Sequence, residues 1–466
     1  MVSAPSRTYS ALGGTNVVPA AACGHEPARF VQPWTGEPGT AGAVAVVGAG
    51  KMGLTLVGQF ASHGWHVIAV DIDARVIDSI NAGRSHIDEP GLDEIVSGAR
   101  KAGALRGTTD GREAAEAADV IVLIVPIMLD ASGSPDYRTM DAAVEAIRPG
   151  LHPGQTVIFE TTLPVGDTRT RYGPRLAASG LAIEEDLFVA FSPERLYSGA
   201  ALDNLALYPK LVGGLGPAST ARAAAFYESV LDVEIVAMSS AEAAEFAKLA
   251  ETTYRDVNIA LANEFAGYAA SLDLDIREVI AAANSQPYSH VHQPGIGVGG
   301  HCIPVYPRFL MAGGANLPMV ALAREINDGQ VAAAIRFVEG ELGELKGESV
   351  LVLGLTYRSG VKELAYSQGP ALIQALRAAG ANVHAFDPLL EDEEIRRLGA
   401  EPYPWGRELD VSVIITQTSD RTWEQLDLGW FPRLRWLLDG RNSLGAVHLA
   451  PGVSYAGIGV PVRVGR

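Results

Sequence analysis

The residues Val44-Ala45-Val46-Val47-Gly48-Ala49-Gly50-Lys51-Met52-Gly53 decide the fold of the N-terminal part of the chain. An apolar run typical of a buried strand is followed at once by the spacing G-x-G-x-x-G, and a helical pattern then covers residues 54–63. Gly48 makes the tight turn, Gly50 lets a ligand approach the backbone, and Gly53 allows close packing of the helix. This order predicts a dinucleotide-binding βαβ unit.

An acidic residue at the end of the next predicted strand, residues 66–70, indicates which cofactor binds. Asp71 lies 18 positions after Gly53, about the spacing that a dinucleotide site needs. Its carboxylate would accept hydrogen bonds from the ribose hydroxyls and repel a 2′-phosphate, so we expect NAD rather than NADP. We expect Lys51 and Met52 to contact the cofactor at the helix N-terminus. The simpler interpretation is a tight turn without a ligand.

Further apolar runs predict two doubly wound parallel sheets, because they alternate with helical segments. These runs lie at residues 119–125, 155–159, 350–355, 383–386 and 411–416. Residues 241–270 and 318–342 predict two long helices between the sheets. The fold class is therefore α/β, with two Rossmann-like domains joined by a helical centre. The expected domains are an NAD-binding domain at 41–235, a helical dimerisation domain at 236–330 and a nucleotide-sugar-binding domain at 331–466.

Composition excludes several classes of protein. A formal net charge of −18 argues against a broad nucleic-acid or anionic-membrane surface, and the longest apolar run, 120–129, is too short to span a bilayer. Residues 1–40 have neither a helical period nor the apolar segment of a signal peptide, so we expect a disordered extension. Only Cys23 and Cys302 occur, which excludes a disulfide framework and favours a cytoplasmic location. We expect no bound metal.

Cys302 follows a glycine-rich loop, residues 295–300. A lone cysteine is usually a small buried hydrophobe. The glycines, however, would leave the approach to the thiol open and present N–H groups that could bind oxyanions. A thiol with a pKa of about 8.5 is only slightly ionised at neutral pH, and a nearby cation would increase the thiolate fraction. His301 and Lys248 are both candidates for this cation.

Taken in order along residues 43–445, the motifs resemble the UDP-glucose/GDP-mannose dehydrogenase family. Within this family the chain is most similar to the branch that acts on UDP-N-acetylhexosamines, because Arg195 directly follows Glu194. The matching segments are residues 48–53, 88–92, 160–166, 192–195, 210–214, 244–249, 254–260, 297–304, 354–357 and 439–442.

The resemblance implies an enzyme that oxidises C6 of the sugar twice without releasing the aldehyde. One hydride goes to NAD, Cys302 captures the aldehyde as a thiohemiacetal, a second hydride leaves a thioester, and water releases the uronic acid. Lys248 would stabilise the oxyanion, Glu194 would act as acid and base, and Thr162 would position water beside the cofactor. Without the resemblance, Lys248 would be interpreted as a solvated helix lysine and Glu194 as a helix-start carboxylate.

The resemblance also implies a nucleotide-sugar substrate, linked to UDP rather than GDP, and a homodimer built on the long middle helices. The residues expected to bind the substrate are Glu194, Arg195, Arg255, Asn258, Gly297, Gly299, Gly300, Arg358 and Arg441.

Four positions depart from the family pattern. Tyr306 stands where the family has an aspartate, and Thr252 stands where it has an asparagine. Residues 125–128, Val-Pro-Ile-Met, replace V-P-T-P, whose threonine lies near the nicotinamide, and residues 364–367, Leu-Ala-Tyr-Ser, replace L-R-E-S. A tyrosine with a pKa of about 10 cannot replace a carboxylate as a base at neutral pH without a large shift.

These departures leave two chemistries open. Either Glu194 and Lys248 complete a four-electron oxidation, or one hydride transfer yields a ketone or an aldehyde, as an unusual sugar of a secondary metabolite would require. A non-catalytic nucleotide-sugar-binding protein is a third hypothesis. A β-hydroxyacid or 6-phosphogluconate dehydrogenase would share the first two domains, but it lacks a cysteine loop and a second α/β domain of this kind.

Overall fold

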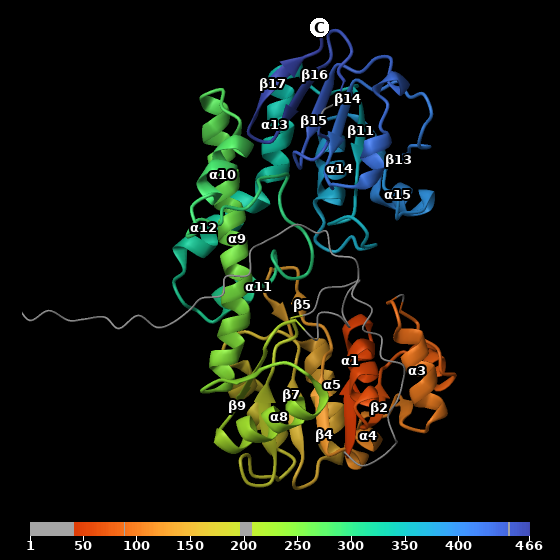
Figure 1. The fold of residues 1–466 in the computed structure, drawn as a ribbon, viewed down its shortest axis with the longest axis vertical. Coiled ribbons are helices and arrows are strands. Elements are labelled where there is room, and N and C mark those ends of the chain that lie inside the picture. The colour runs from red at the N-terminus through yellow and green to blue at the C-terminus, as the bar shows by residue number, and fades with distance from the viewer. Residues whose placement is uncertain (1–41, 88, 196–206, 446–447) are drawn as a thin grey trace, which may run out of the picture.

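The computed structural model describes residues 42–87, 89–195, 207–445 and 448–466. The predicted disordered extension at 1–40 lies outside the described residues. Figure 1 shows an N-terminal lobe and a C-terminal lobe that are joined along one side by the long helix α9 (Ala241–Ser271). No helix in the described ranges is long and apolar enough to cross a membrane.

The N-terminal lobe contains a sheet of eight strands in the order β10-β9-β8-β7-β4-β1-β2-β3. Its strands are β1 (Ala43–Val47), β2 (His66–Val70), β3 (Leu105–Thr108), β4 (Val120–Leu123), β7 (Thr156–Phe159), β8 (Phe188–Phe191), β9 (Lys210–Gly214) and β10 (Ile235–Ala237). Neighbouring strands are parallel except β8 and β9. The chain order reverses between β1 and β4, so their carboxyl ends form the switch point at which doubly wound folds bind ligands.

Helices cover both faces of this sheet, which confirms the predicted doubly wound α/β fold. They are α1 (Lys51–Ser62), α2 (Ala74–Asn81), α3 (Leu92–Lys101), α4 (Gly111–Ala117), α5 (Arg138–Ile147), α6 (Gly173–Ala177) and α8 (Pro217–Val230). The four apolar strand runs predicted in this part of the chain correspond to β1, β2, β4 and β7.

The middle of the chain is helical and includes α9, α10 (Ile276–Asn284) and α11 (Tyr306–Ala312). The prediction of a single helix over residues 318–342 is wrong, because Gly329 separates α12 (Pro318–Asp328) from α13 (Gln330–Leu342). The break lets the two helices pack on different partners. Arg324 of α12 forms a buried ion pair with Asp256 of α9 at 2.5 Å, whereas α13 packs into the core of the second sheet.

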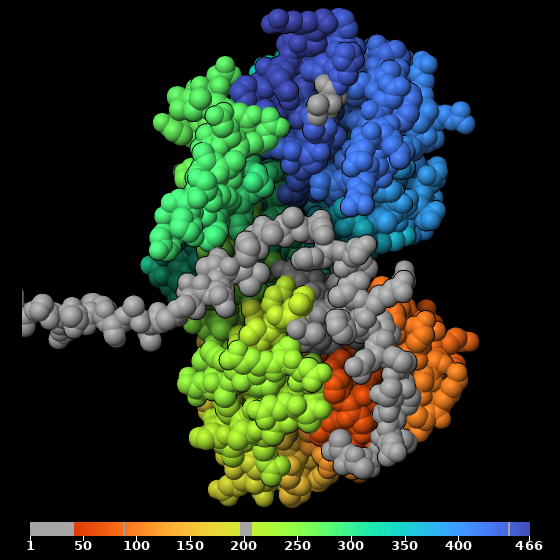
Figure 2. Space-filling view, in the orientation of Figure 1, coloured from red at the N-terminus to blue at the C-terminus, as the bar shows by residue number. Residues whose placement is uncertain are grey.

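The C-terminal lobe contains a seven-stranded sheet in the order β13-β12-β11-β14-β15-β16-β17, and only β17 is antiparallel to its neighbour. Its strands are β11 (Ser349–Leu353), β12 (Asn382–Phe386), β13 (Glu401–Pro402), β14 (Val413–Thr416), β15 (Trp436–Asp439), β16 (Ser454–Gly457) and β17 (Val460–Val464). Helices α14 (Gln368–Ala378) and α15 (Asp392–Leu398) belong to this second Rossmann-like unit. In Figure 2 this blue lobe stands above the N-terminal lobe.

Candidate functional site

The glycine turn after β1 has the geometry of a dinucleotide site. Gly48 adopts φ +101°, which favours glycine. A Cβ at Gly53 would lie 1.8 Å from the carbonyl oxygen of Gly48, so only glycine lets α1 start this close to β1. A Cβ at Gly50 would have no heavy atom within 4 Å, and Gly50 provides no side-chain cap for α1. The first-turn amides, including those of Lys51 and Met52, are therefore suited to a pyrophosphate.

Asp71 connects the end of β2 to this turn. Its Oδ2 accepts a hydrogen bond from the amide of Ala49 at 3.0 Å, and its Oδ1 accepts one from the amide of Asp73 at 2.9 Å. A carboxylate has about four acceptor positions, so two remain for ribose hydroxyls. The residues present therefore fit NAD.

Side chains from three distant segments of the chain meet at Cys302. Cys302 is partly buried, and Tyr306 lies close enough to Cys302 and Thr162 for their side chains to affect its pKa. The Nζ atom of Lys248 on α9 lies 5.9 Å from the centre of the Tyr306 ring. The structure thus brings together the thiol, an ammonium group and two hydroxyls.

Lys248 is the cation beside the thiol. The residue is only 6% exposed, so its interpretation as a solvated surface lysine is wrong. Burial lowers the pKa of the Lys248 ammonium, whereas the nearby Cys302 opposes this change. His301, the other candidate cation, instead forms an ion pair with Glu363.

The side chains at the two substituted positions, Tyr306 and Thr252, are poor bases. Burial, and then the proximity of Cys302, raise the pKa of Tyr306 well above its ordinary value, so the phenol stays neutral. Thr252 is fully buried, and its hydroxyl donates to the carbonyl of Lys248 at 3.3 Å. Tyr306 therefore presents a neutral phenol at this site, and Thr252 bonds within its own helix.

Glu194 follows β8 and is held by polar contacts. Its Oε1 accepts a hydrogen bond from the amide of Arg195 at 2.5 Å, and its Oε2 lies 3.7 Å from the Nζ of Lys210. The guanidinium of Arg195 pairs with Glu251 at 3.0 Å. The contact with Lys210 could not be predicted from spacing, since it depends on how the sheet is ordered.

The glycine-rich loop before Cys302 packs against the C-terminal lobe. A Cβ at Gly297 would lie 2.9 Å from the side chain of Gln368, and one at Gly299 would lie 2.8 Å from the carbonyl oxygen of Tyr366. Gly300, with φ +88°, lies against the ring of Tyr357. We expected these glycines to keep the approach to the thiol open, but close contact between loop and lobe explains why glycine is needed at these positions.

The predicted substrate-binding side chains lie in different surroundings. The guanidinium of Arg441 donates to the carbonyl of Gln417 at 2.9 Å, and burial lowers its pKa. Arg358 lies 5.6 Å from the centre of the Tyr357 ring, and Arg255 is partly buried on α9. Asn258 donates to the carbonyl of His290 at 2.7 Å, so its amide holds the loop that leads to the glycines.

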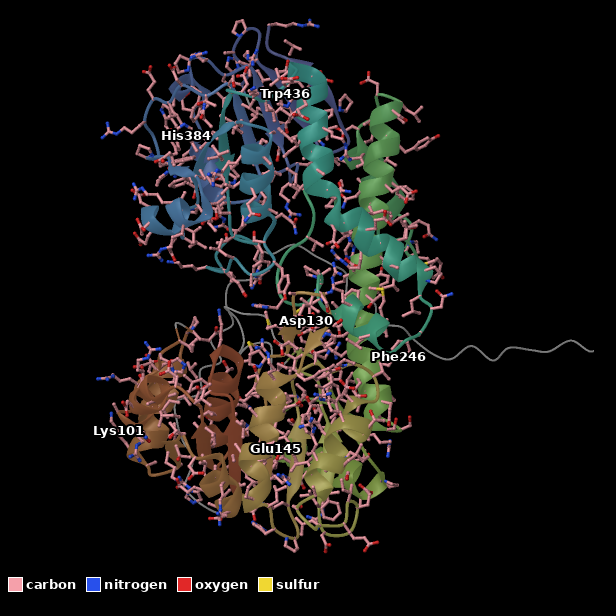
Figure 3. The ribbon with its side chains drawn as sticks, turned by 180° about the vertical axis from the view of Figure 1, so that it is seen from behind. Lys101, Asp130, Glu145, Phe246, His384 and Trp436 are labelled. Carbon is pink, nitrogen blue, oxygen red and sulfur yellow. The ribbon has the colours of Figure 1, made fainter. Side chains whose placement is uncertain are left out.

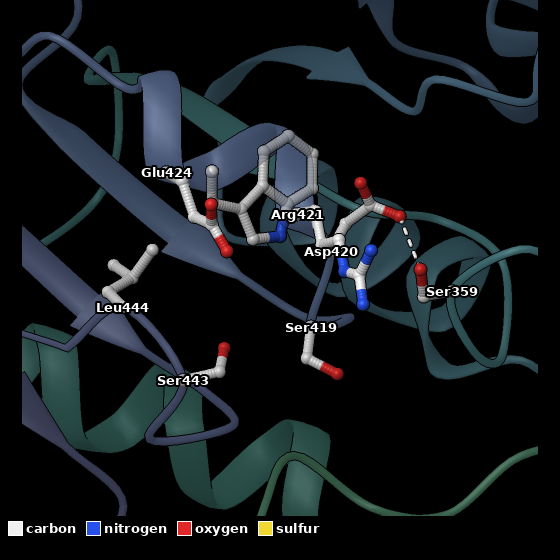
Figure 4. Close-up of a pocket in the computed structure, with 8 residues that line it drawn as sticks. Ser359, Ser419, Asp420, Arg421, Glu424, Ser443 and Leu444 are labelled. Carbon is white, nitrogen blue, oxygen red and sulfur yellow. Dashed lines mark hydrogen bonds between the residues drawn. The ribbon is translucent and has the colours of Figure 1, made fainter. Parts of the chain in front are cut away.

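Two hollows lie near these residues. The first, of about 300 Å³, is lined by Ser359, Ser419, Asp420, Arg421, Trp423, Glu424, Ser443 and Leu444, and Figure 4 shows the hydrogen bond from Ser359 to Asp420. The second, of about 570 Å³, lies beside the hairpin of β5 (Met128–Leu129) and β6 (Pro135–Asp136). Figure 3 shows Asp130 of this hairpin at the end of the N-terminal lobe that faces the C-terminal lobe. There the hydroxyl of Tyr366 accepts a hydrogen bond from the amide of Leu129 at 3.3 Å.

Comparison with known proteins gives matches along most of the chain. Three domain models of the UDP-glucose/GDP-mannose dehydrogenase family match in order: the NAD binding domain at residues 42–231, the central domain at 242–329 and the UDP binding domain at 351–446.

Individual relatives act on N-acetylated sugars by name. UDP-N-acetyl-D-mannosamine dehydrogenase of Salmonella typhi is 35% identical over 371 residues, which cover 76% of this chain and 86% of that protein. NDP-N-acetyl-D-galactosaminuronic acid dehydrogenase of Ralstonia nicotianae is 34% identical over 341 residues, covering 72% and 79%. The solved structure of UDP-D-ManNAc dehydrogenase from Pyrococcus horikoshii matches with a TM-score of 0.80 and 29% identity, covering 90% of this chain and 99% of that one.

Proposed function

The chain belongs to the UDP-glucose/GDP-mannose dehydrogenase family, and from this premise we propose that it oxidises C6 of a UDP-linked N-acetylhexosamine to the uronic acid with NAD. The observation that carries the proposal is the contact network of Cys302, Lys248, Tyr306 and Thr162. A UDP-linked substrate is supported by the match of residues 351–446 to the UDP binding domain. The relatives that act on N-acetylmannosamine support the sugar class.

NAD, when bound, supplies the acceptor for each hydride. The turn formed by Gly48, Gly50 and Gly53 would hold its pyrophosphate at the N-terminus of α1, and Asp71 would bind the adenosine ribose. A NAD-binding domain is a property of the family, and the preference over NADP is part of this proposal.

Side chains of this protein would carry out the steps of the reaction other than hydride acceptance. Lys248 stabilises the alkoxide as the hydroxyl proton leaves, because its ammonium group is buried and solvent screens it little. The Cys302 thiolate adds to the aldehyde carbonyl to form a thiohemiacetal, and loss of the second hydride leaves a thioester. Water, positioned by Thr162, then attacks the thioester and gives its proton to Glu194, which passes the proton to the leaving thiolate of Cys302. The products are the uronic acid and the free thiol.

A single two-electron oxidation is the second candidate, and two observations favour it. Tyr306 is a neutral phenol, and the hydroxyl of Thr252 bonds within its helix, so neither assists hydrolysis of a thioester. The product would then be a ketone or an aldehyde of an unusual sugar. A non-catalytic binding protein would form no NADH at all.

The nucleotide would bind on the C-terminal lobe, beside the glycine loop. Among the described residues, no carboxylate side chain pairs with the partly buried guanidinium of Arg441, which therefore suits a phosphate. We propose that Arg195, Arg255 and Arg358 bind the same nucleotide-sugar. Asn258 would act indirectly, by holding the loop.

A homodimer is supported by the exposed face of α9. Its large apolar residues recur at intervals of three, four, seven or eight positions, which places them on one stripe. They are Phe246, Tyr254, Leu261, Phe265, Tyr268 and Leu272, the last of which directly follows the helix. Figure 3 shows Phe246 on the outer side of the helix. Because exposed apolar stripes of this size mark interfaces, we propose that two copies pair along α9. A cytoplasmic location remains a prediction from the two cysteines.

The decisive experiment mixes the purified protein with NAD and UDP-N-acetylmannosamine, then with other UDP- and GDP-linked sugars. Two NADH per sugar, with a product heavier by one oxygen and lighter by two hydrogens, would support the four-electron proposal. One NADH, with a product lighter by two hydrogens only, would favour the second candidate. Absence of NADH with every sugar would contradict both.

A further inference from the structure

The side chain of Tyr366 links the C-terminal lobe to the N-terminal lobe. Tyr366 lies between β11 and α14, but its side chain packs against the apolar core of the N-terminal lobe. Among the described residues that form or flank this core, every other one lies between Ala45 and Leu310. The hydroxyl of Tyr366 also accepts a hydrogen bond from the amide of Leu129, in the β5–β6 hairpin, at 3.3 Å. Tyr366 is therefore a direct contact between the two lobes.

The backbone at Tyr366 does not explain why a tyrosine stands there. The amide of Ser367 donates to the carbonyl of Leu364 at 3.0 Å, which closes a turn with Tyr366 at its third position. Tyr366 adopts φ +54°, a left-handed conformation that is uncommon and costly for a bulky side chain. Glycine or asparagine is preferred at such a position. The contacts of the side chain, rather than the turn, therefore account for this residue.

Tyr366 also contacts the loop that leads to Cys302. Its ring meets the ring of His301 edge to face, with the ring centres 6.0 Å apart. A Cβ at Gly299 would lie 2.8 Å from the carbonyl oxygen of Tyr366, so the loop runs directly against this turn. His301, the neighbour of Cys302, is held further by its ion pair with Glu363. The same residue thus touches both the Cys302 loop and the N-terminal lobe.

We propose that Tyr366 is a positioning residue, which fixes the Cys302 loop against the lobe that binds the cofactor. The proposal rests on the role of Cys302 as the nucleophile, proposed above. The oxidised carbon of the sugar must be within reach of both the thiol and the cofactor site at the carboxyl ends of β1 and β4. Leu129 lies shortly after β4, so its bond to Tyr366 sets the loop relative to this end of the sheet. A displacement of about 1 Å between reacting groups can lower a rate about a hundredfold.

A hollow beside this contact separates the two lobes. It has a volume of about 570 Å³ and is lined by the β5–β6 hairpin on one side and by the start of α14 on the other. Tyr366 bridges the edge of this hollow through its hydroxyl and its ring. The family pattern has a glutamate at this position, which could accept the bond from Leu129 but has no ring to pack on the core or on His301. The tyrosine therefore holds the loop by contacts that a glutamate cannot make.

Two variants of Tyr366 should reduce kcat to different extents without affecting cofactor binding. Tyr366→Phe keeps the ring but loses the hydroxyl, so kcat should fall severalfold. Tyr366→Asn also removes the ring, although asparagine tolerates the left-handed backbone, and kcat should fall about tenfold or more. The Kd for NAD should stay within about twofold of the wild-type value, because NAD binds within the N-terminal lobe. Asp273→Asn, at an exposed residue with φ +56°, is the matched control and should keep the wild-type kcat.

Alkylation of Cys302 tests the position of the loop without using activity. The full-length protein is treated with iodoacetamide well below its melting temperature, and peptide masses give the rates at Cys302 and at Cys23, the internal reference. Because the loop loses a support, the ratio of these rates should rise severalfold in Tyr366→Asn and less in Tyr366→Phe. A purely structural role would lower the melting temperature without changing the ratio, and an unchanged ratio would overturn the proposal. If the ratio rises while Cys302→Ala keeps full activity, Tyr366 still positions the loop and the role of Cys302 as the nucleophile fails.

Discussion

The amide of Tyr306 donates a hydrogen bond to the carbonyl of Cys302 at 2.9 Å, four residues earlier in the chain. This bond keeps the phenol close to the thiol, and the proximity of Cys302 adds to the rise in the pKa of Tyr306. A neutral phenol can donate a hydrogen bond to a thiolate but cannot take a proton from water. The contact therefore suits capture of an aldehyde better than hydrolysis of a thioester, and this separates the two halves of the proposed reaction.

Replacement of Cys302 should stop the reaction after the first of its two oxidations. If the oxidation removes four electrons, Cys302→Ala should form no more than one NADH per sugar and accumulate no uronic acid, since no thioester can form. Cys23→Ala is the matched control and should keep two NADH per sugar. NADH absorbance and product mass give the answer. If the Cys302→Ala variant still makes uronic acid at the wild-type rate, the covalent mechanism is excluded.

Loss of the buried ammonium should damage either version of the chemistry. Lys248→Met should lower kcat on the order of a hundredfold or more, because an alkoxide must be stabilised before any hydride leaves. The exposed Lys101, changed to Met, is the control and should leave kcat within about twofold. Steady-state kinetics with a check of melting temperature would show the difference. Equal kcat in both variants would mean that Lys248 has no part in the chemistry.

Cofactor choice should depend on Asp71. The wild type should use NAD far better than NADP, and Asp71→Ala should raise the KM for NAD and relax the preference, because the ribose loses an acceptor and a 2′-phosphate is no longer repelled. Asp78→Ala, at an exposed position on α2, is the control. Comparable kcat/KM for both cofactors in the unmutated protein would exclude this assignment.

The stability of the protein should fall as pH rises toward neutrality. Burial raises the pKa of Glu245 from 4.5 to about 7, although Gly166 and Thr168 donate hydrogen bonds to its carboxyl group. Between these two values the folded chain holds a proton that the unfolded chain releases. The stabilisation is therefore complete below about pH 4.5 and lost by about pH 7, at about 1.4 kcal/mol per pKa unit.

Glu245→Gln should flatten this slope, which denaturant unfolding between pH 5 and 7 would measure. Glu160 has a similarly raised pKa, so the single variant should keep part of the slope and the double variant with Glu160→Gln should lose most of it. A slope in Glu245→Gln as steep as that of the wild type would contradict the prediction.

A charge on the apolar stripe of α9 should separate the proposed dimer. Phe265→Lys would place an ammonium group in an apolar interface, where its desolvation is not compensated. We expect sedimentation to give the monomer mass for this variant and the dimer mass for the wild type. Ala332→Lys, on an exposed position of α13, is the control. If the wild type sediments as a monomer, the proposed pairing of two copies along α9 is contradicted.

Features that depend on neighbours along the chain could be predicted from the sequence. The strand, the glycine turn and Asp71 predicted the first βαβ unit, because close packing at Gly48 and Gly53 is a local requirement. Glycine-rich β9, with Lys210 at its start, was not predicted, since its pattern is not that of a continuous apolar strand. The break at Gly329 cannot be recognised from the sequence because the helix formers on both sides continue the same pattern.

The chemistry of the site depends on contacts between segments that are distant in the sequence. Thr162 and Tyr306 are far apart in sequence, and the carboxyl end of β7 and the start of α11 bring their hydroxyls together. Likewise, Glu160 and Lys210 meet because the sheet places β7, β8 and β9 next to one another. Burial then sets which groups hold a proton, and burial depends on the packing of the whole domain rather than on the identity of any single residue.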